Sequence, residues 1–346
     1  MLRGGKHCAA SDRGDRHNQW SPIGIAVPAW IGGLRVKTSR RGDGDSRNRS
    51  RELSQRLARL YYLQFSTPFT RDNIDRPMPK PPTHNVSTIR GYFEFVDQQR
   101  QVANGALWYR GVNAAGHALL PSLYRQRPAK TITELAKLEA ALMERFRQRS
   151  IPFHNRSLRD DWETLFFMQH YGIPTRLLDW TENPLVALFF AVMYARPTKS
   201  GAGGFQTDTA VWVLDPVSWN RHALRHQTYD GGVLSGGDVA LGGYRPSPDF
   251  AGMNNHPVAL YGAHNSQRIV AQRGVFTVFG QNVDPMETAF SKDRFPAESL
   301  NKLLISRGNI AEIRKSLLEY GITDSVVFPD LDGLAREIKR QFNFEV

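Results

Sequence analysis

Apolar residues recur at helical spacing in several segments of the chain. In 134–149 they fall at Leu135, Leu138, Leu142 and Phe146. Residues three and four apart share one face of an α-helix, so this spacing predicts an amphipathic helix. The same argument predicts further helices over 51–65, 88–101, 161–170, 183–195 and 309–320.

Shorter runs of β-branched and aromatic residues predict strands. They cover 106–109, 209–214, 268–279 and 302–305, and 268–279 gives the strongest signal. Alternation in that run places Arg268, Val270 and Gln272 on one strand face. The glycine-rich stretch 230–253 predicts an exposed loop.

Composition divides the chain into three parts. Residues 1–50 are rich in Gly, Arg, Ser and Asp without any period, and we predict a flexible basic arm. Residues 51–86 join one helix to a proline-rich linker, which predicts a domain boundary. Residues 87–346 interleave short strands with helices without a strict βαβ rhythm. This part predicts an α+β domain with a mixed sheet core and flanking helices.

The net charge of +12 is concentrated near the N-terminus. Residues 1–60 hold 13 Lys or Arg against 5 Asp or Glu. Basic segments attract polyanions without sequence preference, so the arm is a candidate to bind RNA or DNA. The alternative is a solvated leader with no partner.

Several classes of protein and site are disfavoured. Cys8 is the single cysteine, which rules out an internal disulfide and argues against a cysteine-based zinc site. The longest weakly polar run, 23–34, is shorter than the roughly 20 apolar residues of a membrane-spanning helix. Charges between Asp12 and Arg16 interrupt the place where a secretory signal would be apolar. We expect a cytoplasmic protein with no bound metal and no membrane partner.

Candidate chemistry begins at the end of the first predicted strand of the domain. There the chain reads Trp108-Tyr109-Arg110-Gly111. An arginine in this place can bind phosphate or carboxylate through two N–H groups, and Gly111 would let the backbone turn or approach a ligand. The alternative is an arginine tied to a core carboxylate or to backbone carbonyls.

The densest polar segment is 169–184, which lies between two apolar helices. Its candidates to face a ligand are His170, Arg176, Asp179 and Thr181. A purely structural hydrogen-bond network is the alternative. A third segment, 265–276, contributes Gln272, and an edge strand with a solvated polar face is the alternative there.

These motifs together resemble the FRG domain family, which is named for an aromatic-Arg-Gly motif. They are Tyr109-Arg110-Gly111, Leu120-Pro121-Ser122-Leu123, the run 169–181 and Gln272-Arg273-Gly274-Val275-Phe276. The resemblance covers about residues 88–330 and depends mainly on the long central motif. Members occur in bacteria and their mobile elements, and the resemblance implies no settled activity.

The order of the motifs is also similar to that of ADP-ribosyltransferases. Arg110, Thr181 and Gln272 match the arginine, Ser/Thr and catalytic glutamate positions of those enzymes in turn. The similarity implies an ADP-ribosyltransferase-like arrangement of the sheet, with NAD as substrate. It implies a cofactor-binding set of Tyr109, Arg110, Gly111, His170, Tyr171 and Arg176. Gln272 departs from the pattern because it is not an acid. Another residue would then have to supply the catalytic carboxylate, with Asp179 as the first candidate and Glu182 as the second.

We therefore predict an NAD-dependent ADP-ribosyltransferase acting as a toxin or antiviral effector on a nucleic acid or translation component. A neutralising antitoxin is the partner that this role implies. One alternative is a phosphate-ester hydrolase or nuclease with His170 and Asp179 as acid–base pair and Arg110 and Arg176 as phosphate clamps. The lack of clustered carboxylates counts against a two-metal nuclease. A non-catalytic nucleotide-binding module is the other alternative.

Overall fold

A computed structural model describes residues 78–344, apart from 104, 155–157, 159, 199–203, 230, 247–251 and 264–266. The predicted basic arm over 1–50 and the predicted helix over 51–65 lie outside the described residues. Within the described ranges, no helix combines the length and the apolar character needed to cross a membrane.

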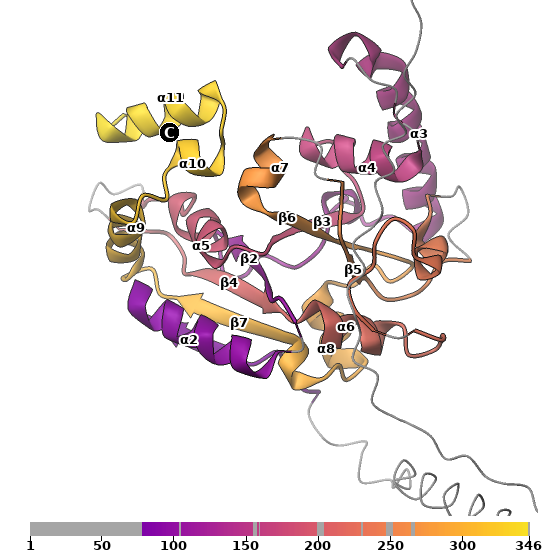
Figure 1. The fold of residues 1–346 in the computed structure, drawn as a ribbon, viewed down its shortest axis with the longest axis horizontal. Helices are drawn as coiled ribbons and strands as arrows, with labels where there is room; N and C mark the ends of the chain where they lie inside the picture. Colours follow the sequence, from indigo (N-terminus) through magenta and orange to yellow (C-terminus); the bar gives the residue numbers. More distant parts are fainter. Residues whose placement is uncertain are drawn as a thin grey trace, which may run out of the picture. The chain divides into compact units, whose positions relative to one another are not determined.

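A mixed seven-stranded sheet forms the centre of the described part (Figure 1). Its order is β1-β7-β4-β2-β3-β6-β5, in which β1 and β7 are parallel and all other neighbours are antiparallel. The strands are β1 Thr83–Val86, β2 Trp108–Val112, β3 Leu177–Thr181, β4 Thr209–Leu214, β5 Val258–Leu260, β6 Gly274–Val278 and β7 Leu300–Ile305. The predicted α+β fold with a mixed sheet and flanking helices is confirmed.

The helices flank this sheet, and the amphipathic segments of the sequence account for five of the longer ones. The predicted helices correspond to α2, α3, α4, α5 and α9. The α-helices of the described residues are α2 Ile89–Val102, α3 Ile132–Ser150, α4 Asp161–His170, α5 Pro184–Met193, α6 Pro216–Ala223, α7 Gln267–Gln272, α8 Met286–Lys292, α9 Ile310–Glu319, α10 Asp324–Val327 and α11 Leu331–Gln341. Local capping sets their starts: Thr131 and Glu134 form a reciprocal capping box before α3. Asn183 caps α5, and Pro184 follows at its first position.

Three predictions about local structure need correction. The predicted strand 268–279 is a helix, α7, followed by the shorter strand β6. Arg273 separates them with a φ of 46°, so Arg268 and Gln272 lie on a helix and not on one strand face. The predicted loop 230–253 contains a 3₁₀ helix, η4 Val239–Tyr244, that buries Leu241 and Tyr244. The strand predicted over 106–109 is β2, which begins and ends later, so Arg110 lies inside the strand and not beyond its end.

Two apolar clusters cover the two faces of the sheet. Alternation along β2 sends Trp108 and Val112 into one cluster and Tyr109 into the other. The first cluster includes side chains of α3, α4, α6 and α8, and the second includes side chains of α2, α5 and α9. Removal of this apolar surface from water is the main source of stability for such a layered fold.

Gly111 lets α5 pack directly against β2. A Cβ at this position would lie 1.9 Å from the carbonyl oxygen of Ala187 and 2.7 Å from the amide nitrogen of Ala191. Both neighbours are backbone atoms of α5, which cannot move aside as a flexible side chain would. The glycine therefore serves helix–strand packing, whereas the sequence suggested a turn or the close approach of a ligand.

We predict that Gly111→Ala destabilises the protein by about 1–3 kcal/mol, because the added methyl group overlaps the backbone of α5. The free energy of unfolding in denaturant measures this change. Gly116→Ala is the matched control, since a Cβ there meets nothing within 4 Å, and its effect should stay within about 0.5 kcal/mol. Equal stability of the two variants would contradict the packing role.

Candidate functional site

The sheet opens between β2 and β3. In the described structure these strands are paired only at Tyr109–Thr181, whereas β2 and β4 are paired along five positions. From that point β2 continues to Arg110 and Gly111 without further pairing to β3. Backbone groups on the facing edges therefore need other partners.

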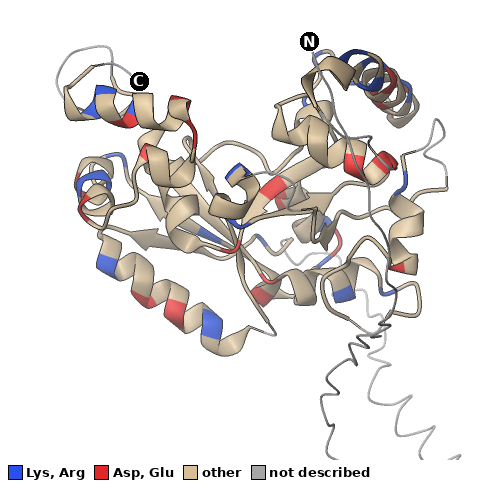
Figure 2. Ribbon diagram, turned by 45° about the horizontal axis from the view of Figure 1, so that its top comes forward, with Lys and Arg blue, Asp and Glu red and all other residues tan. Residues whose placement is uncertain are grey.

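Arg110 supplies one of those partners. Its Nη1 donates a hydrogen bond to the backbone carbonyl of Asp179 and lies 3.9 Å from Oδ2 of the same residue. The guanidinium thus connects β2 to β3 where the two strands are not paired through their backbones. The strands carry few charges (Figure 2): among Lys, Arg, Asp and Glu, the seven strands hold Arg110, Asp179 and Lys302 alone.

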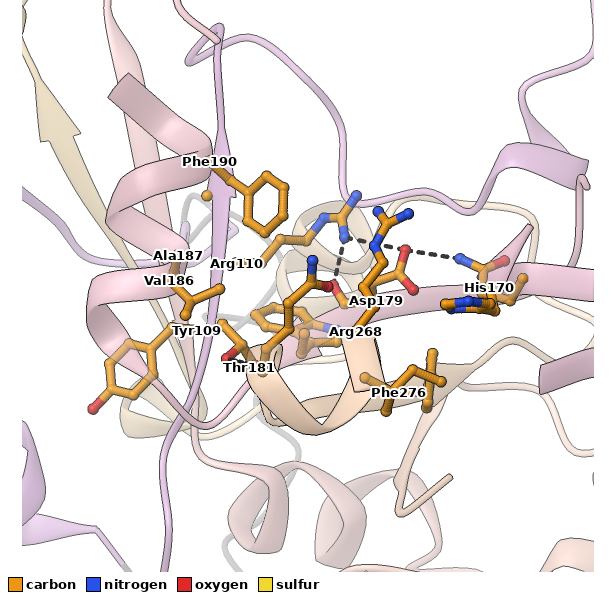
Figure 3. Close-up of a pocket in the computed structure, with 15 residues that line it drawn as sticks. Tyr109, Arg110, His170, Asp179, Thr181, Val186, Ala187, Phe190, Arg268 and Phe276 are labelled. Carbon is orange, nitrogen blue, oxygen red and sulfur yellow. Dashed lines mark hydrogen bonds and ion pairs between the residues drawn. The ribbon is translucent and has the colours of Figure 1, made fainter. Parts of the chain in front are cut away.

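A cavity of about 250 Å³ lies at this opening (Figure 3). Arg110 and Asp179 contribute its charged groups from β2 and β3, and Arg268 contributes a third from α7. Phe190 of α5 and Phe276 of β6 add aromatic surface. The lining comprises Tyr109, Arg110, Gly111, Gln169, His170, Asp179, Trp180, Thr181, Val186, Ala187, Phe190, Arg268, Ile269, Gln272 and Phe276. Apolar surface with a few converging polar groups is typical of small-molecule sites.

Arg110 is largely desolvated and incompletely satisfied. Its side chain is 20% exposed, and burial lowers the pKa of its guanidinium, while Asp179 opposes that shift. The buried Nε has no hydrogen-bond partner among the described residues. An unpaired buried N–H costs about 1–3 kcal/mol, so the position of Arg110 is maintained at a cost in stability.

Asp179 presents an oriented carboxylate to the cavity. Its side chain is 56% exposed although Leu178 and Trp180 on either side are buried. Gln169 fixes the carboxylate, because its Nε2 donates to Oδ2 over 2.7 Å. Thr175 fixes Gln169 in turn by donating to its Oε1 over 2.5 Å. This chain of hydrogen bonds holds an exposed acid in one orientation.

Thr181 and Gln272 lie in the lining, and both make bonds to backbone groups. The hydroxyl of Thr181 donates to the carbonyl of Gln272 over 2.5 Å and accepts from the amide of Asn183 over 2.9 Å. The side-chain amide of Gln272 donates to the carbonyl of Val327 over 3.1 Å. These contacts join β3, α5, α7 and α10 around the cavity.

The comparisons with known proteins give one match. Residues 105–200 match the family model of the FRG domain. The chain contains an FRG domain. This confirms the family that the sequence motifs resemble, over a shorter stretch than the 88–330 expected from the motifs. No curated protein and no solved structure matches the chain.

The FRG match supplies only part of the cavity. It includes β2, β3, α4 and α5, and hence Arg110, Gln169, Asp179 and Thr181. Arg268 and Gln272 lie on α7, beyond the matched residues. The cavity therefore combines the FRG segment with a later part of the chain.

Contacts with the C-terminal helices hold α7 in place. The guanidinium of Arg268 lies 4.8 Å from the ring centre of Phe328, and that of Arg336 lies 4.5 Å from the same ring. Buried Asp324 pairs with Arg340 at 2.7 Å and with Arg336 at 3.7 Å. Cation–π contacts contribute about 0.5–2 kcal/mol, so they can fix the position of Arg268 beside the cavity.

His170, Asp179 and Thr181 of the central motif line the cavity, whereas Tyr171 does not. Arg176 also lies outside the cavity. Its guanidinium is fully buried and contacts Glu139 of α3 through Nε at 2.9 Å and Nη2 at 2.5 Å. Such a pair leaves a charge uncompensated if one partner is removed, at a cost of about 3–5 kcal/mol. The residue joins β3 to α3 in the core.

Two contributors to the site were not among the residues singled out from the sequence. Gln169 belongs to the motif, but nothing in its residue type distinguishes an orienting amide from a surface one. Arg268 was assigned to a strand, and only the helix α7 directs it to the cavity. Among the described residues, no group of three His, Cys, Asp or Glu side chains could hold a metal ion.

His170 lines the cavity in its neutral form at pH 7. Burial lowers the pKa of its imidazole, and the positive charge of Arg268 lowers it further. In the unfolded chain a histidine has a pKa of about 6.5. As pH falls through that value the unfolded state binds more protons at this position, so acidification removes stability.

We predict that NMR titration gives His170 a pKa below about 6.5 and that Arg268→Gln raises this pKa, because one nearby positive charge is lost. Arg307→Gln serves as the control, since Arg307 is exposed and does not line the cavity. An unchanged His170 titration in Arg268→Gln would show that the two side chains are not electrostatically coupled.

Proposed function

We propose that the FRG-containing chain is an NAD-dependent ADP-ribosyltransferase whose catalytic acid is Asp179. The observation that carries this proposal is the oriented, exposed carboxylate of Asp179 beside the desolvated guanidinium of Arg110. In this proposal Asp179 supplies the carboxylate that ADP-ribosyltransferases carry at the position matched by Gln272. Glu182 is the weaker candidate because it does not line the cavity.

The reaction breaks the bond between C1′ of ribose and the nitrogen of nicotinamide. The bonding electron pair stays on the ring nitrogen, which neutralises the pyridinium, and positive charge develops on C1′ and the ribose oxygen. A carboxylate held next to this centre stabilises that charge in a partly desolvated cavity. The acceptor then attacks C1′ with a lone pair and loses its proton to a base, for which Asp179 is suited.

Other groups of the cavity would bind and orient the substrate. Arg110 lines the cavity, and its guanidinium can donate to a phosphate or ribose oxygen. Phe190, which is partly exposed, offers aromatic surface to the nicotinamide ring. Thr181 and Gln272 act by holding α5 and α7 around the cavity.

We predict that purified protein releases nicotinamide from NAD and that Asp179→Asn lowers kcat at least about 100-fold, because the substitution removes the charge and the base. Gln169→Ala should lower kcat roughly 10-fold, as expected for one hydrogen bond to a charged group. Chromatographic measurement of nicotinamide gives both values.

Asp97→Asn is the control for that measurement, since Asp97 is a 71% exposed carboxylate on α2 outside the cavity. Full activity in Asp179→Asn, at a melting temperature equal to that of the wild type, would exclude Asp179 as the catalytic acid. Cleavage of a phosphate ester without any release of nicotinamide would favour a hydrolase with His170 and Asp179 as acid–base pair.

The biological role that we propose is that of a toxin or antiviral effector acting on a nucleic acid or a translation component. The excess of positive charge over residues 1–60 supports electrostatic attraction to RNA or DNA. Attraction of this kind speeds encounter with a polyanion without selecting a sequence. A neutralising partner would restrain the activity in the producing cell.

We predict that expression of the wild-type chain arrests growth of a bacterial host and that Asp179→Asn at equal abundance does not. The arrest follows if modification of a few targets is enough to block an essential process. Growth curves with immunoblots for abundance measure the effect. Harmless wild-type protein, expressed without a neutralising partner, would contradict the role as a toxin.

A further inference from the structure

A second cavity of about 700 Å³ adjoins the first beside Asp179. The two share Gln169, His170, Asp179 and Arg268 in their linings. The remaining lining of the larger cavity comprises Ser122, Tyr171, Gly172, Ile173, Gln267, Pro329 and Asp330. A ligand longer than the first cavity can therefore continue past Asp179 and Arg268 into the second.

Tyr171 gives the larger cavity a fixed aromatic surface. Its side chain is 62% exposed, and its ring makes edge contacts with Phe167 at 5.0 Å and with His170 at 4.8 Å between centres. The backbone is held by the end of α4, where Gly172 has a φ of 73° and donates to the carbonyl of Gln169. Ile173 donates to the carbonyl of Met168, which completes a Schellman motif. An exposed, restrained ring of this kind can stack with a nucleobase.

Charged groups share the lining of the larger cavity with this ring. Arg268 lines both cavities at their junction, and a guanidinium there suits a phosphate that links two halves of a ligand. Asp330 caps α11 by accepting from the amide of Gly333 over 2.7 Å. A carboxylate accepts several hydrogen bonds, so Asp330 can also accept from an exocyclic amine.

We propose that the larger cavity is the subsite for the adenosine half of a dinucleotide, with adenine stacked on Tyr171 and the pyrophosphate at Arg268. The proposal extends the proposed function, which needs only the nicotinamide-ribose half in the first cavity. An adenine nucleotide is favoured over a base of a nucleic acid because the shared lining places the second half of the same ligand here.

Isothermal titration of the full-length chain tests the subsite with three probes: AMP, ADP-ribose and ribose 5-phosphate. Tyr171→Ala should weaken binding of AMP and ADP-ribose by about 5- to 150-fold, the loss expected for one stacked base, and leave ribose 5-phosphate unchanged. Tyr171→Phe keeps the ring and should bind like the wild type. Tyr320→Ala is the matched control, because Tyr320 is 63% exposed at the C-terminal end of α9 and lines neither cavity.

Three outcomes would overturn the subsite. They are equal affinity of wild type and Tyr171→Ala for AMP, equal affinity for AMP and ribose 5-phosphate, and Tyr171-dependent binding of a single-stranded oligonucleotide without binding of AMP. Release of nicotinamide from NAD is measured in parallel. Tyr171-dependent AMP binding without any such release would support the subsite while contradicting the proposed transferase.

Discussion

The bond from Arg110 to the backbone carbonyl of Asp179 joins two strands where their own pairing has stopped. Because a side chain makes this connection, β2 and β3 can separate and still satisfy a backbone acceptor. The cavity forms in the space that results, and the carboxylate of Asp179 faces it. Arg110 thus brings a positive charge to the cavity and also joins the two strands that border it.

Close packing fixes the elements on either side of this opening. Gly111, the next residue of β2, brings the backbone of α5 against the strand, and α5 places Phe190 in the cavity. On the side of β3, the buried pair of Arg176 and Glu139 joins the residue before that strand to α3. The motif that resembles the FRG family therefore contains two kinds of conspicuous residue. Some face the cavity, and others fix the strands that carry them.

The fold class and the helices α2, α3, α4, α5 and α9 were predictable from the sequence, because helical spacing reports burial directly. The short strands β1, β3 and β5 were not predicted. The predicted α4 matches the observed bounds, and α3 differs by two residues or fewer at each end. The strand predicted over 268–279 was wrong in its first half, where α7 lies, and right in its second half, where β6 lies. A six-residue helix is too short to show a helical period, and β-branched residues favoured a strand.

The site was predictable only in part, for a different reason. Residue types identified Arg110 and Asp179 as able to bind a ligand, and the structure brings both to one cavity. Residue type could not distinguish the exposed Asp179 from the buried Arg176, because both are charged and stand three positions apart. Whether a charged side chain is buried depends on the partner that packs against it. For Arg176 that partner is Glu139, which comes from a distant part of the chain.

A crystal structure of the Asp179→Asn protein with NAD tests the central claim most directly, since the variant should bind the substrate without consuming it. The account predicts that the nicotinamide ribose lies in the cavity between β2 and β3, with a ribose hydroxyl or C1′ in contact with residue 179 and Arg110 bonded to the ligand. Clear density for NAD at another surface, with this cavity empty and Arg110 bonded only to the backbone of β3, would contradict it.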